Sequence, residues 1–283
     1  MKPNIAVLTD SSSDLPQALI ASHDNVAVVP AVVTFDNQEY LDRVTMTPAE
    51  FYQRLRVSDT LPKTASPAPA AIIQAIAQLI DRGYTQIVAF TVAGVLSATQ
   101  QSFQLAAAQF PQAQIKVFDT KSVGIGSGLQ AAYALKLIDE GVTWENLIQN
   151  LTSSIKNSHV YFYIPTLKYL RAGGRIGRVA GLVGSALKLK PVISCDTEGT
   201  YYPIAKSRSE HKALTKMIAL ATDSFADTDL IAVAYGDHLE RAQQLASLVE
   251  QTTHRPVDFI GDISPALGVH VGPDLLGIGV LHH

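Results

Sequence analysis

The sequence predicts an α/β protein with two domains. Short runs of β-branched residues alternate along the chain with longer segments of helical periodicity, a pattern typical of strands joined by crossover helices. The chain has 283 residues, 47% of them hydrophobic and 17% charged, so it is near the length at which one core divides into two. We expect an N-terminal α/β domain over residues 1–158, with a mainly parallel sheet and helices on both faces, and a C-terminal α/β domain over residues 159–283, with a mixed sheet.

The elements of the first domain follow from this alternation. The predicted strands are residues 5–8, 26–33, 86–91 and 115–118. The predicted helices are residues 15–21, 69–82, 98–109, 128–141 and 144–157. Residues 63–69 are predicted to be a proline-bounded loop that opens a helix, because the residue before each proline is pushed toward extended geometry. This loop is a candidate for ligand contact.

The second domain shows the same kinds of segment in a less regular order. The predicted strands are residues 159–164, 191–195, 201–205, 230–235, 257–260 and 277–281, and the predicted helices are residues 209–223 and 239–252. Residues 263–274 form a glycine-punctuated segment that we expect to be a loop. It contains His270, and its flanking residues Gly268 and Gly272 suggest that something approaches the backbone closely there.

The positive charge of the chain is concentrated in one segment. Residues 156–195 contain seven lysines and arginines and no aspartate or glutamate, whereas the rest of the chain, of net charge -3 overall, holds fifteen basic and twenty-five acidic residues. Arginines suit oxygen anions, and the glycines around Arg175 permit close backbone approach. The segment therefore predicts an anion or an acidic partner, although a solvated basic face is an equally simple interpretation.

Several functional classes lack their sequence signatures. There is no Walker-type phosphate loop, and the glycines of residues 124–128 do not have the spacing of the dinucleotide fingerprint. The single Cys195 and the spacing of the eight histidines argue against a disulfide and a metal site. No apolar run is long enough to span a membrane and the first residues do not resemble a signal peptide, so we expect a soluble cytoplasmic protein without a metal or cofactor.

Hydroxyl-rich turns follow three of the predicted strands, at residues 9–14, 91–99 and 119–122. Ligands of parallel sheets collect at the carboxyl ends of strands, beside helix N-termini that favour anions. Ser97 is a candidate ligand for an oxyanion, and its alternative role is to cap the following helix. Asp119 is predicted to be structural, because it can orient neighbouring loops through hydrogen bonds.

The chain resembles the DegV family. The resemblance rests on six motifs that occur in the family's order: residues 9–15 (TDSSSDL), 63–67 (KTASP), 96–102 (LSATQQS), 119–122 (DTKS), 170–176 (LRAGGRI) with 189–193 (LKPVI), and 270–273 (HVGP). Together they span essentially the whole chain. Two motifs depart from the family's usual pattern: Ala98 and Gln100 stand where glycine and tyrosine are common, and Asp274 stands where glycine is common. A carboxylate at this position would repel an anionic ligand, so we expect the side chain of Asp274 to point away.

The resemblance implies a bacterial fatty-acid-binding protein of the EDD fold, with the lipid between the two domains. The acyl chain would lie in an apolar tunnel, and its carboxylate would be held by Thr64, Ser97 and His270. Arg175 would lie near the head group or tunnel mouth and serve phosphorylation by a partner. In that role the protein is no enzyme: it presents the carboxylate to a separate ATP-using fatty acid kinase, which makes an acyl phosphate for phospholipid synthesis. Candidate lining residues are Ala93, Val95, Ile125, Ile164, Leu182, Val183 and Leu187.

Two other functions compete with this hypothesis. A stand-alone acyl ester hydrolase would use Ser97 as nucleophile and His270 as base, although no Gly-x-Ser-x-Gly elbow is present. A nucleic-acid-binding regulator would use the basic segment, but the net charge is negative and no helix-turn-helix pattern stands out. Acyl-chain length and saturation depend on tunnel packing and do not follow from the residues alone.

Overall fold

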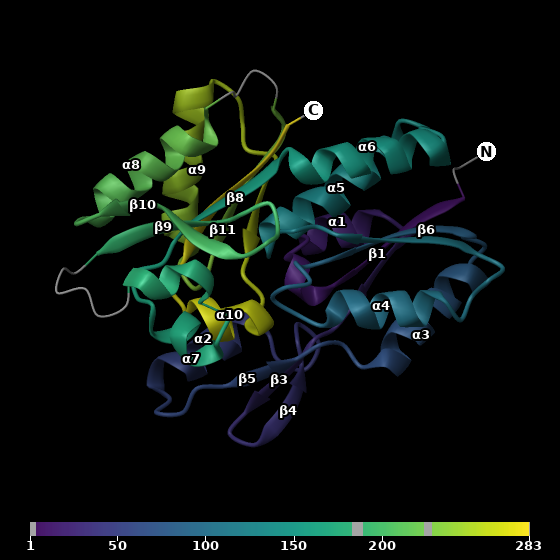
Figure 1. Cartoon of the computed structure of the whole chain (residues 1–283), viewed down its shortest axis with the longest axis horizontal. Coiled ribbons are helices and arrows are strands. Elements are labelled where there is room, and N and C mark those ends of the chain that lie inside the picture. The colour runs from purple at the N-terminus through teal and green to yellow at the C-terminus, as the bar shows by residue number, and fades with distance from the viewer. Residues whose placement is uncertain (1–3, 183–188, 224–227, 283) are drawn as a thin grey trace.

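The computed structural model describes residues 4–182, 189–223 and 228–282 and arranges them around three β-sheets (Figure 1). The first sheet is parallel, in the order β2-β1-β6-β7. Its strands are β1 (Ile5–Asp10), β2 (Val26–Val29), β6 (Gln86–Thr91) and β7 (Gln114–Asp119). Alternate residues of β1 and β6 point to opposite faces, so Leu8 packs toward one helical layer and Val7 toward the other. The predicted parallel sheet with helices on both faces is confirmed.

Five helices accompany this sheet: α1 (Gln17–Ser22), α3 (Pro69–Asp81), α4 (Thr99–Ala107), α5 (Ile125–Asp139) and α6 (Trp144–Lys156). The helices α3 and α4 cover one face, where Ile72, Ile76 and Phe103 pack against β1 and β6. The helix α5 covers the other face and also packs against α6 (Figure 1). Both faces of the sheet are therefore withdrawn from water, which explains its nearly continuous apolar strands.

The second sheet is mixed and six-stranded, in the order β10-β9-β8-β13-β11-β12. Its strands are β8 (Ser158–Tyr163), β9 (Lys190–Cys195), β10 (Tyr201–Ser207), β11 (Thr228–Tyr235), β12 (Phe259–Asp262) and β13 (Leu276–His282). Only β11 and β12 pair in parallel; the other neighbours are antiparallel. The helices α8 (Glu210–Ala221) and α9 (Leu239–Thr253) pack on one face, and α5 packs on the other. The predicted mixed sheet is confirmed.

The helix α5 lies between the two large sheets. All of its residues except Lys136 and Asp139 are buried, because it contacts β1 and β6 on one side and β8, β11 and β13 on the other. Apolar or small residues on most sides of a helix are the expected consequence of such burial. The predicted boundary at residue 158 falls where α6 ends and β8 begins. Because α5 is shared by both sheets, the division into two domains stays a prediction.

A third, small sheet was not predicted. It contains β4 (Gln38–Leu41), β3 (Val32–Phe35) and β5 (Lys63–Ala65) in antiparallel order and is joined to α2 (Pro48–Val57). The prediction of one strand over residues 26–33 is wrong, because Pro30 and Ala31 separate β2 from β3 and the two strands belong to different sheets. Proline has no N–H for the ladder and ends the first pairing. The predicted loop over residues 63–69 likewise contains β5.

Three helices were also missed: α7 (Lys168–Gly173), in the basic segment, and two that have local signals. The helix α2 begins with a capping box formed by Thr47 and Glu50. The predicted loop over residues 263–274 contains α10 (Pro265–Val271), whose first turn is capped by Ser264. A serine or threonine followed directly by proline marks both starts. Apart from these corrections, the predicted elements end within three residues of the observed ones.

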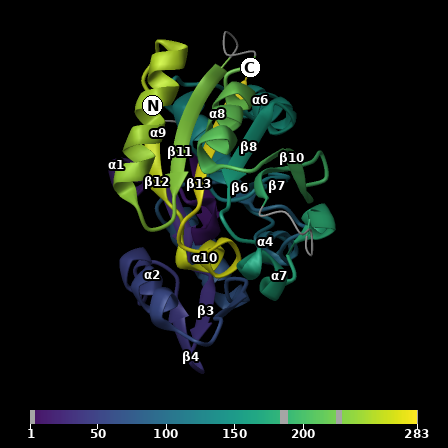
Figure 2. The ribbon, with the colours of Figure 1, turned by 90° about the vertical axis from the view of Figure 1, so that its left-hand side faces the viewer.

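Between β8 and β9, the described part of the basic segment forms two short helical elements, α7 (Lys168–Gly173) and the 3₁₀ turn η2 (Gly177–Leu182). Figure 2 shows α10 below the second sheet and above α2 and β3. The helix α10 contacts α7, β5 and the 3₁₀ turn η1 (Ser11–Ser13) as well. It thus lies where the small sheet, the turn after β1 and the helix α7 meet. Among the described residues, no helix has both the length and the apolar character needed to cross a bilayer.

Candidate functional site

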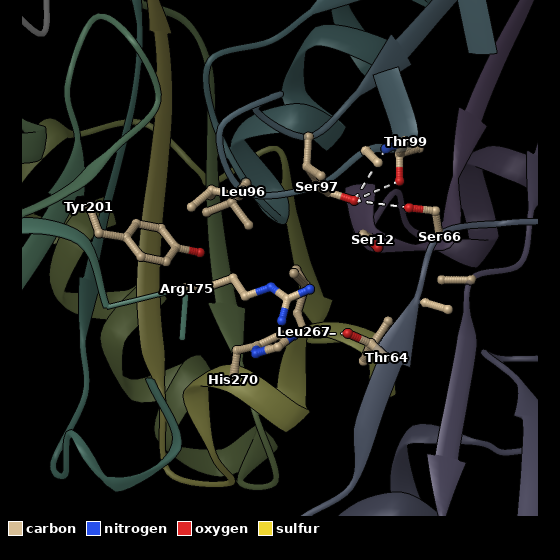
Figure 3. Close-up of a pocket in the computed structure, with 16 residues that line it drawn as sticks. Ser12, Thr64, Ser66, Leu96, Ser97, Thr99, Arg175, Tyr201, Leu267 and His270 are labelled. Atoms are coloured by element: carbon tan, nitrogen blue, oxygen red, sulfur yellow. Dashed lines mark hydrogen bonds between the residues drawn. The ribbon is translucent and has the colours of Figure 1, made fainter. Parts of the chain in front are cut away.

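A cavity of about 260 Å³ lies where β5, the turn before α4, α10 and the segment after α7 meet (Figure 3). The predicted ligand residues Thr64, Ser97 and His270 all line it, and so does Arg175. Of the sixteen described residues around the cavity, none is acidic and only Arg175 carries a permanent charge. The structure therefore brings together four residues that lie on separate segments of the chain.

Thr64 and His270 form one side of the cavity. The Oγ1 atom of Thr64 lies 3.0 Å from Nε2 of His270, so strand β5 and helix α10 are joined by a hydrogen bond. Gly173, at the end of α7, lies directly against the imidazole, and a Cβ at this position would collide with Nδ1 of His270. The absence of a side chain at Gly173 is what allows α7 to pack this closely on α10.

His270 is neutral at physiological pH. Its side chain is only 8% exposed, and burial, followed by the nearby charge of Arg175, lowers the pKa of His270 to about 4. Nδ1 has no hydrogen-bond partner among the described residues. If Nε2 carries the hydrogen and donates it to Thr64, the threonine hydroxyl hydrogen remains available for an acceptor in the cavity.

Ser97 belongs to a second, separate group of hydroxyls. Its Oγ atom lies 3.3 Å from Oγ of Ser66 and 2.8 Å from Oγ1 of Thr99, and it accepts a 3.3 Å hydrogen bond from the backbone N–H of Thr99. Figure 3 shows this group and Ser12 on the side of the cavity away from His270. Ser97 thus contributes to the start of α4 and also faces the cavity.

The hydrolase hypothesis requires a hydrogen bond between Ser97 and His270, because the base must take the proton of the nucleophile. Among the described residues no such bond is present: Nε2 of His270 contacts Thr64, and Ser97 contacts Ser66 and Thr99. No carboxylate orients the imidazole either, since its unbonded atom is Nδ1. The arrangement fits the binding of an oxygen-rich group better than nucleophilic catalysis.

Arg175 lies at the rim of the cavity. Its side chain is exposed, and its Nη1 atom donates a 2.9 Å hydrogen bond to the carbonyl of Gly173. It forms no ion pair within the described part of the chain, whereas Arg178, three residues later, is paired with Asp196. A guanidinium without a carboxylate partner beside a cavity without acidic residues favours an anion.

A narrow apolar chamber opens behind the polar cavity and shares Val123, Tyr201 and Leu267 with it. Its volume is about 20 Å³, roughly the space of one water-sized sphere. It lies between the start of α5, helix α10 and the inner face of the second sheet. Its other lining residues are Gly124, Ile125, Val160, Phe162, Ala234, Ile263, Val271, Leu275 and Gly277.

The predicted lining residues have different positions. Ile125 lines the apolar chamber. Ala93, Ile164 and Leu182 are buried core residues that are not among the described residues around either cavity. Val95 is 57% exposed, because it lies in the turn between β6 and α4, so it forms no wall of a buried tunnel in this structure. Val183 and Leu187 lie outside the described residues.

A buried ionic network beneath the polar cavity was missed. The side chains of Asp10, Asp14 and Asp42 are at most 1% exposed. Burial raises the pKa of Asp10 to about 6, of Asp14 to about 7 and of Asp42 to about 6, despite hydrogen bonds and the charge of Arg43 that act in the opposite direction. Asp10 and Asp14 belong to the hydroxyl-rich turn at residues 9–14, and Asp42 and Arg43 belong to no motif of the sequence.

This network connects the elements that carry Thr64 and His270. Oδ1 of Asp14 accepts hydrogen bonds from the N–H of Ser264, at 2.8 Å, and from Arg43. Arg43 also donates to the side chain and the carbonyl of Asp262. Ser264 caps α10, and Arg43 follows β4, so the contacts hold α10 against the small sheet. They position the two halves of the Thr64–His270 pair.

Two acidic residues near the motifs face away from the cavity. Asp274 accepts a 3.0 Å hydrogen bond from Arg56 and lies 3.4 Å from Nε2 of His238, so the prediction that its carboxylate points away is confirmed. Asp119 accepts hydrogen bonds from the N–H groups of Gly94 and Lys121. Its structural role, which orders the turn before α4, agrees with the sequence-based prediction.

Comparison with known proteins adds independent information. The sequence profile of the DegV family, described as a family of uncharacterised proteins, matches residues 4–283. A DegV domain-containing protein of Clostridium acetobutylicum is 32% identical over 278 residues and covers 97% of each chain. A fatty-acid-binding DegV family protein of Thermus thermophilus has 28% identity and a TM-score of 0.87 over 99% of each chain. A stearic-acid-binding protein of Eubacterium ventriosum has 27% identity and a TM-score of 0.91 over 98% of each chain.

Proposed function

The chain belongs to the DegV family, and from this premise we propose that it binds a long-chain fatty acid. The carboxylate would occupy the polar cavity and the acyl chain the apolar chamber behind it. The observation that supports this most directly is the junction of the two spaces at Val123, Tyr201 and Leu267. An amphipathic ligand with one anionic end matches such a junction, and solved relatives of similar fold bind fatty acids.

The carboxylate would be held by neutral donors from both sides of the cavity. Thr64, oriented by His270, can donate its hydroxyl hydrogen to one oxygen, and Ser97 can donate to the other. A neutral His270 suits this role, because a charged imidazole would compete with Thr64 for the ligand. Hydrogen bonds of this kind orient the head group and leave oxygen lone pairs accessible for reaction.

The acyl chain would supply most of the affinity. Burial of each methylene contributes about 0.8 kcal/mol before the costs of association are subtracted. The chamber of about 20 Å³ is too narrow for a long chain, so the side chains between α5, α10 and the second sheet must move apart as the ligand enters. Two glycines of β13, Gly277 and Gly279, face α5 and keep this layer thin.

We infer that the bound carboxylate is presented to a partner ATP-dependent fatty acid kinase. A carboxylate oxygen would attack the γ-phosphorus of ATP held by the partner; the new O–P bond forms as the bond to ADP breaks, and ADP leaves with the electron pair. Arg175 at the rim, free of a carboxylate partner in the described structure, would stabilise the incoming phosphate charge. The chain would thus act as the lipid-carrying subunit, in the cytoplasm where ATP is present, and would supply acyl phosphate for phospholipid synthesis.

The test is an organic extract of the protein purified from bacteria, analysed by mass spectrometry. We expect about one long-chain fatty acid per chain, and binding of added hexadecanoate to the delipidated protein. If no lipid is extracted and no hexadecanoate binds, the proposal is wrong. Turnover of acyl esters that disappears in Ser97→Ala would instead favour the hydrolase hypothesis.

A further inference from the structure

A second cleft, with a volume of about 800 Å³, lies outside the lipid site. Tyr201 of β10 lines the polar cavity and its neighbour Tyr202 lines this cleft, because adjacent residues of a strand point to opposite faces. Among the described residues, the cleft shares no wall residue with the polar cavity and only Val160 with the apolar chamber. Its volume lies in the range of small-molecule sites, so it is a candidate for a ligand of its own.

Two sequence features that the proposed function does not use meet in this cleft. Three residues of the motif at 119–122 line it. So do Lys156, Arg178 and Cys195, which come from the start, the middle and the end of the basic segment. The concentration of positive charge in that segment predicts an anion or an acidic partner, and the cleft is a place where the two ends of the segment come together.

The carboxylates around the cleft already have donors. Asp119 accepts hydrogen bonds from two backbone N–H groups and lies 3.1 Å from Nζ of Lys121. Asp196 also accepts hydrogen bonds from two backbone N–H groups and is paired with Arg178. Glu198 lies 3.7 Å from Nζ of Lys121. Within the described part of the chain, the cleft therefore has no uncommitted carboxylate that would select a cationic ligand.

Several donor groups around the cleft have no partner among the residues that the structure describes. The ammonium of Lys156 forms no ion pair, and the hydroxyl of Tyr202 forms no hydrogen bond. Oγ of Ser122 and Oγ of Ser158 are buried and also lack a partner. A buried hydroxyl without a partner is costly, and a rotation about the Cα–Cβ bond can turn each serine oxygen toward the cleft without the loss of a hydrogen bond. The unused donors favour a ligand rich in acceptors.

The unpartnered groups lie close together at the floor of the cleft. A Cβ on Gly126 of α5 would meet Oγ of Ser122 and Cβ of Val160, so these two side chains are neighbours. Ser158 lies two residues before Val160 in β8 and points to the same face of the sheet. Lys156, the last residue of α6, precedes Ser158 by two residues. Two hydroxyls and one ammonium therefore surround one region of the cleft.

We propose that the cleft binds a small phosphate monoester that carries a ring, the chemistry of a nucleoside monophosphate. A phosphate group has three strong acceptor oxygens, which suit an ammonium and two hydroxyls better than the two oxygens of a carboxylate. Ile155, Val160 and the ring of Tyr202 supply an apolar wall for the attached ring. This inference does not depend on the proposed function, because the cleft is separate from the polar cavity.

Calorimetry with three probes tests the chemistry of the ligand. Adenosine monophosphate carries both the phosphate and the ring, adenosine carries only the ring, and inorganic phosphate carries only the anion. We expect the purified full chain to bind adenosine monophosphate at least about tenfold more tightly than either of the other two probes.

Two variants test the location of the site. Lys156→Gln removes the unpaired ammonium and Ser158→Ala removes a buried hydroxyl, and each should lower the affinity for adenosine monophosphate about tenfold. Ser158→Ala should not lower the melting temperature, because its hydroxyl has no partner to lose within the described structure. The matched controls are Lys216→Gln, on the exposed side of α8, and Ser153→Ala, on the exposed side of α6. They should leave this affinity unchanged, and all four variants should bind hexadecanoate within about threefold of wild type, since none of these residues is among the described lining of the lipid site.

Four results would overturn the inference. The first is no binding of adenosine monophosphate at millimolar concentration, and the second is an equal affinity for adenosine or for inorganic phosphate. The third is an unchanged affinity in both folded variants, which would place the binding elsewhere. The fourth is displacement of adenosine monophosphate by hexadecanoate, because the cleft would then be the far end of the lipid site. Failure of hexadecanoate to bind, with adenosine monophosphate bound as expected, would contradict only the proposed function.

Discussion

The polar cavity and the apolar chamber share three wall residues, yet they are built in opposite ways. The cavity is about 260 Å³ and is lined by hydroxyls, an imidazole and a guanidinium; the chamber is about 20 Å³ and is lined by aliphatic side chains, Phe162 and glycines. The first is a roomy polar site, and the second is a narrow apolar seam beside the packed core. The contrast indicates that head-group orientation and chain affinity are properties of different regions, which substitutions can separate.

The largest effect should come from filling the apolar chamber. Gly277 lines it, and a Cβ there would meet nothing closer than 3.4 Å, so a longer side chain would fold into the space meant for the ligand. Excluding about four methylenes costs roughly 3 kcal/mol, so Gly277→Leu should weaken hexadecanoate binding about 100-fold, as measured by calorimetry. Gly277→Ala is the control, with an expected change below about threefold. A folded Leu variant that binds normally would show that the chain takes another route.

The next effect should be specific to the head group. Thr64→Val keeps the shape of the side chain but removes the hydroxyl, so it should weaken hexadecanoate binding about tenfold. Hexadecanol, which has the same chain without a charge, should lose much less affinity. Thr34→Val, on the adjacent strand β3 and not among the described lining residues, should leave both ligands unaffected. Equal losses for acid and alcohol would contradict the separation of the two regions.

A third measurement concerns the ionic network that lies only under the polar cavity. The folded state raises the pKa values of Asp10 and Asp42 to about 6 and of Asp14 to about 7, from 3.8. It therefore holds protons that the unfolded chain releases, and stability is lost as the pH rises from about 4 to about 7. His270, with a pKa lowered to about 4, acts in the opposite direction over a similar window, but it is one group against three.

Asp14→Asn should make this loss of stability shallower, by at most about 1.4 kcal/mol per pH unit, the value for one proton. Urea unfolding at about pH 4.5, 6 and 7.5 gives the slope directly. Asp81→Asn, at the exposed end of α3, is the matched control and should leave the slope unchanged. An identical slope in wild type and Asp14→Asn would mean that the carboxyl is ionised in the folded protein over the whole range.

The smallest effect on affinity should come from the rim. Arg175 is exposed and screened by water, so Arg175→Gln should change hexadecanoate affinity less than about threefold. Phosphorylation of the bound acid by a fatty acid kinase should nevertheless fall by about tenfold or more, because the developing phosphate charge loses its partner. Arg171→Gln removes one positive charge from the same basic segment. An equal fall in the phosphorylation rate in this variant would show that the charge of the segment, and not the position of Arg175, is responsible. Loss of affinity with an unchanged rate would place Arg175 in the carboxylate site instead.

Local patterns identified most of the architecture. The strand at residues 86–91 and the helix at residues 239–252 were predicted almost to the residue, because periods of 2 and 3.6 residues reflect backbone geometry. The break at Pro30 and the Ser-Pro start of α10 are also local signals in the sequence, but hydrophobic periodicity alone does not reveal them. The family motifs placed Thr64, Ser97, His270 and Arg175 together, and all four line one cavity.

By itself, the sequence determined the α/β class, the concentration of positive charge and the residues that would surround a ligand. Only the tertiary structure decided that His270 pairs with Thr64 and Ser97 with Ser66, that α5 is buried between two sheets, and that Asp14 and Arg43 meet beneath the site. The reason is physical: helix and strand propensities act over a few residues, whereas these pairings depend on how distant segments pack, and a pKa depends on the burial that packing creates.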